Sequence, residues 1–86
     1  MTTRQTEYAI DSDGITVWVN GAYCLGRFGR YGIDIHREPT RKDVGECLLC
    51  THGEVTAEDW DVFVVKMREL HGVEVPEKHR PVRFRP

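Results

Sequence analysis

Three residues near the middle of the chain have the types and spacing of a metal or redox site. Cys47 and Cys50 are separated by two leucines, and His52 follows two positions later. A structural zinc site needs four ligands in a tetrahedron, so the remaining ligands would have to come from elsewhere in the chain. In an extended strand, residues three apart point to opposite faces, which would keep the two sulfurs apart. We therefore predict no bound metal and no cofactor, with a small zinc-stabilised domain built on Cys47, Cys50 and His52 as an alternative.

The same region contains the side chains of a candidate acid–base pair. Asp34 and His36 occupy alternate positions of a predicted strand and would share one face. With His52 beside them they could transfer protons, and with Cys50 they could activate a nucleophile. No motif for an oxyanion hole or a phosphate-binding loop accompanies these residues. The sequence therefore predicts a protein without catalytic activity.

Residues 26–32 contain two consecutive copies of a Gly-Arg-aromatic unit. Arginines alternating with aromatic rings can neutralise phosphates and stack on bases. Glycines within strands also mark bulges and bends, so the structural interpretation is one long strand that bends here and continues to residue 36. The alternative, a nucleic-acid contact, rests on Arg27, Phe28, Arg30 and Tyr31.

These residues need a scaffold, and the clearest element of that scaffold is a helix that begins after Thr56 and ends at Gly72. Thr56 is a favoured N-cap residue, Asp59 completes a capping box, and Gly72 suits the left-handed C-terminal position. Val55 and Trp60 can pack together across the helix start. The predicted apolar face recurs at intervals of three and four residues. It comprises Trp60, Phe63, Val64, Met67, Leu70 and His71.

The opposite face of this helix combines two valines with carboxylates. At about 100° per residue, Val62 and Val65 fall among Glu58, Asp61 and Glu69. Isolated surface valines are ordinary in soluble proteins. Carboxylates around an apolar centre are nevertheless suited to a basic partner, so we predict that this face binds protein.

The clearest strand is residues 15–19, and Asn-Gly follows it as a hairpin signal. A two-residue turn there would pair Trp18 with Tyr23 and Val17 with Cys24. This register predicts that Cys24 is buried in the core. It also predicts that Trp18 and Tyr23 lie together on the other face, with Leu25, as an exposed aromatic contact surface.

Length and composition predict one soluble domain of 86 residues, with 40% hydrophobic and 30% charged side chains. We assign residues 1–76 to this domain and residues 77–86 to a basic tail containing proline. No apolar stretch approaches the length of a membrane span, and the first seven residues have no apolar signal region. Together with an odd number of cysteines, these features predict a cytoplasmic protein with three reduced thiols.

The net charge of −2 is unevenly distributed along the chain. Residues 43–77 contain nine acidic and two basic side chains, whereas residues 78–86 contain four basic and no acidic ones. The acidic segment includes the helix, whose surface would repel phosphates and attract a basic partner. We therefore do not expect nucleic acid as the main partner.

Together, these patterns predict an α+β fold. A small, mainly antiparallel sheet of three to five strands is packed on one face by a single helix in the C-terminal half. We expect a small non-catalytic protein-binding module, with the size and composition of accessory, adaptor or inhibitor proteins of phages and mobile elements. Its partner would be a protein with a basic surface. In an alternative arrangement, two copies form a homodimer through a sheet edge or the helix face.

Overall fold

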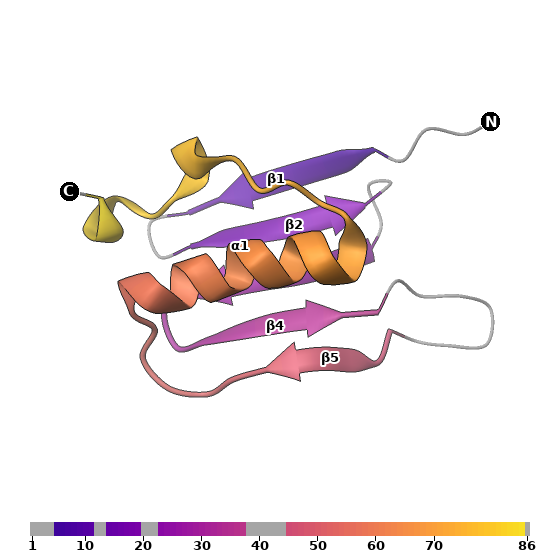
Figure 1. Ribbon diagram of the computed structural model, residues 1–86, viewed down its shortest axis with the longest axis horizontal. Coiled ribbons are helices and arrows are strands. Elements are labelled where there is room, and N and C mark those ends of the chain that lie inside the picture. The colour runs from indigo at the N-terminus through magenta and orange to yellow at the C-terminus, as the bar shows by residue number, and fades with distance from the viewer. Residues whose placement is uncertain (1–4, 12–13, 20–22, 38–44, 86) are drawn as a thin grey trace.

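The computed structural model describes residues 5–11, 14–19, 23–37 and 45–85, and it has two layers. The first layer is a sheet of five strands, and the second contains one α-helix followed by two short 3₁₀ helices (Figure 1). The elements in chain order are β1 (Thr6–Ile10), β2 (Ile15–Val19), β3 (Tyr23–Gly29), β4 (Gly32–His36), β5 (Cys47–Cys50), α1 (Ala57–His71), η1 (Glu77–His79) and η2 (Val82–Phe84). The predicted α+β class and the antiparallel sheet packed by one helix are confirmed.

The five strands follow one another across the sheet in sequence order, and every neighbouring pair is antiparallel. The prediction of one long bent strand through residues 26–36 is wrong. Gly29 pairs with Gly32, so the chain reverses at Arg30 and Tyr31 and forms two strands. These two glycines mark the point where the chain reverses its direction, whereas the predicted bend would have kept one continuous strand.

The predicted register between β2 and β3 is also wrong. Val19 pairs with Tyr23 and Trp18 with Cys24, and the register then shifts by one residue. Leu25 is the extra residue of this bulge, and it is fully buried. A bulge changes which residues of a strand face the core. Because Cys24 pairs with Trp18, it lies on the outer face of the sheet, whereas Leu25 lies in the core.

The helix begins and ends as the sequence predicts. The Thr56 side chain accepts a hydrogen bond from the Asp59 amide at 3.3 Å, and the Asp59 carboxylate accepts one from the Thr56 amide at 2.8 Å. Gly72 adopts the left-handed conformation, with φ 65°, that ends the helix. Trp60, Phe63 and Met67 are fully buried, as expected. Leu70 is 42% exposed, because it lies at the margin of the apolar face.

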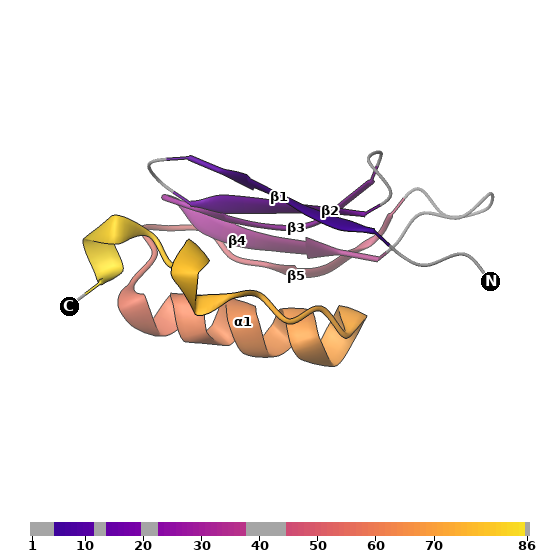
Figure 2. The same cartoon turned by 90° about the horizontal axis from the view of Figure 1, so that it is seen from above.

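One face of the sheet is covered by α1 and by the segment that follows it, and no described element covers the other face, the open face (Figure 2). Residues after Gly72 run back beside β1 on the helix side. The Tyr8 hydroxyl donates a hydrogen bond to the carbonyl of Glu74 at 3.2 Å. Phe84 packs against the core, with its ring 6.0 Å from that of Phe28. The segment assigned to a separate basic tail therefore packs against the domain as far as Phe84.

Candidate functional site

The open face of the sheet carries a continuous row of side chains across all five strands. The register brings together one residue from each strand, in the order Ala9, Thr16, Arg27, Asp34 and Cys50. Successive side chains of a strand alternate between the two faces, so this row is fixed by the same alternation that buries Val17 and Ile35. The result is a surface of mixed charge with a sulfur at its edge.

Among the described residues, Trp18 is a large aromatic residue of this open face. It is 36% exposed, and its register neighbours are Glu7 on β1 and Cys24 on β3. The predicted pairing of Trp18 with Tyr23 is wrong because Tyr23 pairs with Val19, one position from the predicted register, and the side chain of Tyr23 lies outside the described residues. A shallow hollow of about 290 Å³ adjoins the indole and is lined by Glu7, Tyr8, Ala9 and Trp18. An exposed aromatic ring beside a hollow is a feature that a partner can bury.

A second hollow, of about 310 Å³, lies at the turn between β3 and β4. Its lining includes Arg27, Arg30, Tyr31, Asp34, Thr51 and His52. Two hydrogen bonds hold its walls together. The Thr51 hydroxyl accepts from the Ile33 amide at 2.9 Å, and the Tyr31 carbonyl accepts from the Gly53 amide at 3.0 Å. Because aspartates line this hollow together with the arginines, its charge is mixed.

The four residues of the nucleic-acid alternative do not lie on one surface. Arg27, Arg30 and Tyr31 line the second hollow, and the Arg30 guanidinium lies 5.7 Å from the centre of the Tyr31 ring. Phe28 is fully buried and packs edge-on against Trp60, so its assignment to a contact surface is wrong. Strand alternation explains the difference, since Phe28 must point away from the face that displays Arg27.

Cys47 and Cys50 form a disulfide. The predictions that both thiols are reduced and that the two side chains point to opposite faces are wrong. The register between β4 and β5 shifts, with His36 paired to Cys47 and Asp34 paired to Cys50, so Leu48 is an extra residue. This bulge brings both sulfurs to the open face. Among the described residues, no three Cys, His, Asp or Glu side chains gather closely enough to hold a metal ion.

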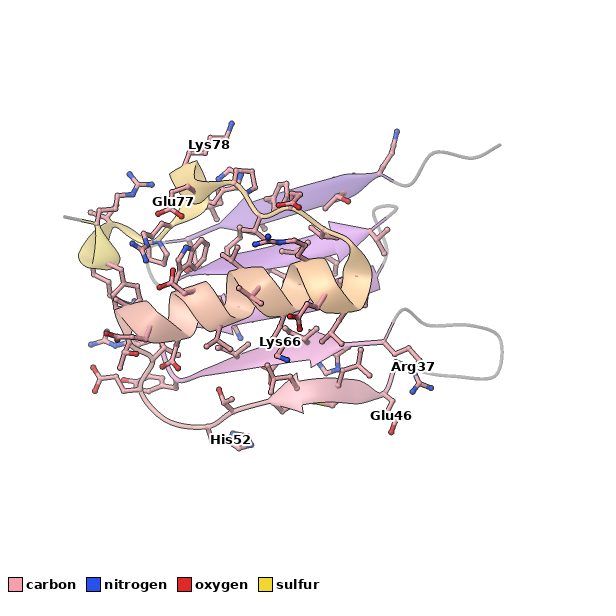
Figure 3. All side chains as sticks on the ribbon, viewed as in Figure 1. Arg37, Glu46, His52, Lys66, Glu77 and Lys78 are labelled. Carbon is pink, nitrogen blue, oxygen red and sulfur yellow. A yellow bond between two sulfur atoms is a disulfide. The ribbon has the colours of Figure 1, made fainter. Side chains whose placement is uncertain are left out.

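The residues of the predicted acid–base pair lie on this same face. Asp34 and His36 occupy alternate positions of β4 and share one face, as predicted. His52 and Asp34 line the same hollow. The Cys50 sulfur is part of the disulfide, so it is not a thiolate nucleophile in this form. The Cys24 thiol is half-buried, and burial raises its pKa. Figure 3 shows His52 on the connection that leads from β5 to α1.

The predicted helix surface is present on the solvent side of α1. Val62 and Val65 are 44% and 42% exposed, and a shallow hollow of about 240 Å³ lies between them. Asp61 and Lys66 complete its lining. Glu58 and Glu69 are also exposed on this helix, so the five predicted residues share a surface.

Two ion pairs partly neutralise the negative charge of this helix surface. The Asp61 carboxylate lies 3.2 Å from the Arg80 guanidinium, and the Glu69 carboxylate lies 3.3 Å from the Lys66 ammonium group (Figure 3 labels Lys66). Arg80 is not among the residues predicted for this surface, and it packs here because the C-terminal segment returns to the helix. The basic residues that follow the acidic helix in the sequence could have indicated such an ion pair.

The two candidate surfaces face in opposite directions. Trp18 lies on the open face of the sheet, whereas Val62 and Val65 lie on the far side of the helix layer. One flat interface therefore cannot include both. Within the described parts of the chain, no helix is both long and apolar enough to span a membrane. No protein-family model matches this chain, and no curated protein or solved structure is significantly similar to it.

Proposed function

We propose that this chain is a small non-catalytic module that binds another protein through the open face of its sheet. The observation that carries the proposal is the position of Trp18, partly exposed on a sheet face that no described element covers. Trp is among the residues most enriched at the energetic centres of protein interfaces. Its indole combines a large apolar area with one hydrogen-bond donor, so a partner gains by burying it.

The surroundings of Trp18 support a protein partner. The adjoining hollow can receive a side chain, and Thr16, Arg27 and Asp34 provide polar groups farther along the same face. Interfaces commonly have this arrangement, in which an apolar anchor is surrounded by polar residues. The mixed charge of the face favours a partner of mixed charge over a polyanion such as nucleic acid.

The solvent face of α1 is the second candidate for the same function. It is supported by the hollow between Val62 and Val65, which would receive an apolar side chain of a partner. The ion pairs of Asp61 and Glu69 weaken the long-range attraction to a basic partner that the sequence alone suggests. We therefore rank this face second.

Photo-crosslinking in the native host distinguishes the two faces. A photoreactive phenylalanine analogue is introduced singly in place of Trp18, Val65 or Val82. Val82 is the matched control, because it is 74% exposed and belongs to neither face. We expect a discrete adduct with another protein from position 18 and none from position 82. A Trp18→Ser variant should weaken binding of the identified partner by about 30-fold, the effect of losing a strong interface residue.

The other outcomes are equally informative. An adduct from position 65 alone assigns the interface to the helix. An adduct of twice the chain mass from position 18 identifies the partner as a second copy of this chain. Equal yields from positions 18 and 82 would indicate random collisions and would refute the proposal.

A further inference from the structure

The disulfide between Cys47 and Cys50 is on the surface, at the edge of the sheet. The two residues are the first and last of β5, both are exposed, and β5 has a strand neighbour on one side among the described residues. Two leucines separate them. A disulfide that closes so short a loop constrains the unfolded chain less than a long-range bridge does. The position of this pair therefore favours reaction with an external thiol over a structural role.

The strand that carries the disulfide is fixed by other contacts. The Arg37 amide donates to the Glu46 carbonyl at 2.7 Å before β5, and the Thr51 amide donates to the Ile33 carbonyl at 2.9 Å after it. Leu49, between the two cysteines, packs against the core. These contacts do not involve sulfur. We therefore expect β5 to remain in the sheet when the disulfide is reduced.

The charges around the two sulfurs differ. Cys50 is the register partner of Asp34, whereas Cys47 is the register partner of His36. Figure 3 labels Arg37 and Glu46, whose side chains form an ion pair at 3.2 Å, and Glu46 directly precedes Cys47 in the chain. A neighbouring carboxylate disfavours a thiolate, whereas the N–H of a neighbouring imidazole can stabilise it by donating a hydrogen bond. Cys47 is thus the better leaving group, and Cys50 is an exposed residue through which a co-reactant can approach. Its register partner Asp34 and its chain neighbour Thr51 line the hollow at the turn between β3 and β4.

We propose that Cys47 and Cys50 form a thiol–disulfide exchange site whose co-reactant is a dithiol. One thiolate of the dithiol attacks the Sγ of Cys50. The S–S bond breaks, and Cys47 leaves as a thiolate that takes up a proton. The second thiol of the co-reactant loses its proton and attacks the co-reactant's other sulfur in the mixed disulfide. Cys50 then leaves as a thiolate that takes up a proton. Two electrons pass from the dithiol, which becomes a disulfide, to the pair, which becomes two thiols.

The exchange is tested on the full chain carrying Cys24→Ser. Cys47 and Cys50 are then the only cysteines in the sequence. The protein is purified without reductant, exposed to millimolar dithiothreitol in native buffer, alkylated, and weighed intact by mass spectrometry. Before reduction we expect no alkylation, and after reduction we expect both thiols to be modified. Far-ultraviolet circular dichroism should remain unchanged throughout. Addition of oxidised dithiothreitol in excess should restore the disulfide.

Single-thiol variants test the difference between the sulfurs. In the Cys24→Ser background, Cys50→Ser leaves Cys47 and Cys47→Ser leaves Cys50. At neutral pH we expect iodoacetamide to alkylate Cys47 about threefold or more faster than Cys50, because the thiolate is the reactive form. A rate for Cys50 equal to or above that for Cys47 would overturn the assigned order of attack.

Two results would overturn the exchange site itself. The first is a pair that remains as two thiols in the presence of excess oxidised dithiothreitol. The second is a disulfide that dithiothreitol reduces only after urea has unfolded the protein, which would assign the bridge a structural role. Neither result affects the proposed binding surface around Trp18, because that surface is tested by crosslinking.

Discussion

Replacement of Phe63 by alanine tests the packing of the helix against the sheet. Phe63 is fully buried between two other fully buried rings. Its ring centre lies 5.8 Å from that of Phe28 on β3 and 5.9 Å from that of Trp60 on the same helix. The substitution removes the phenyl ring and leaves a space that a paired sheet and a capped helix cannot readily close.

The expected loss of stability follows from this geometry. Removing a buried phenyl ring costs about 3–5 kcal/mol, which combines lost burial with the energy of the residual cavity. A domain of 86 residues has a total free energy of unfolding of about 4–13 kcal/mol. The substitution therefore removes a large share of the stability. At about 4–8 °C per kcal/mol, it should lower the melting temperature by roughly 12–40 °C.

The assay is thermal unfolding followed by far-ultraviolet circular dichroism and by tryptophan fluorescence. Agreement of the two probes tests whether unfolding is a single transition. The oxidation state of the cysteines must be the same in both proteins, and Val82→Ala is the matched control because Val82 is 74% exposed. A Phe63→Ala protein that melts cooperatively within a few degrees of wild type would refute the packing described for α1.

Two further predictions concern glycine contacts and pH. Gly14→Ala should destabilise the fold strongly, because the new methyl group would overlap the backbone carbonyl of Phe28. Gly26→Ala should cost less, since its methyl group meets the flexible sulfur end of Met67 at 2.7 Å, and urea denaturation of both variants checks the order. Burial, followed by nearby positive charges, lowers the pKa of His79 below its ordinary value near 6.5, so the unfolded chain binds the proton more readily. Stability should therefore decrease as the pH falls from about 6.5 through the folded-state pKa, and His79→Gln should reduce that decrease in urea titrations from neutral pH to about pH 5.

The sequence by itself determined the features that depend on neighbouring residues. Thr56, Asp59 and Gly72 act within one turn of the helix ends, so their roles could be predicted without the rest of the chain. The buried face with Trp60 and Phe63 follows from helical periodicity alone. The alternation of residues 15–19 likewise predicted which side of that strand is buried.

The tertiary structure decided the features that depend on the register between strands. A one-residue shift exchanges the two faces of a strand, and no local pattern in this sequence marks the bulges at Leu25 and Leu48. The pairing of Cys24 with Trp18 placed Cys24 on the open face, and the bulge at Leu48 brought Cys47 and Cys50 together there. The pairing of distant segments also had to form before Arg80 could reach Asp61. The candidate site therefore combines an aromatic residue that the sequence revealed with a disulfide that required the assembled sheet.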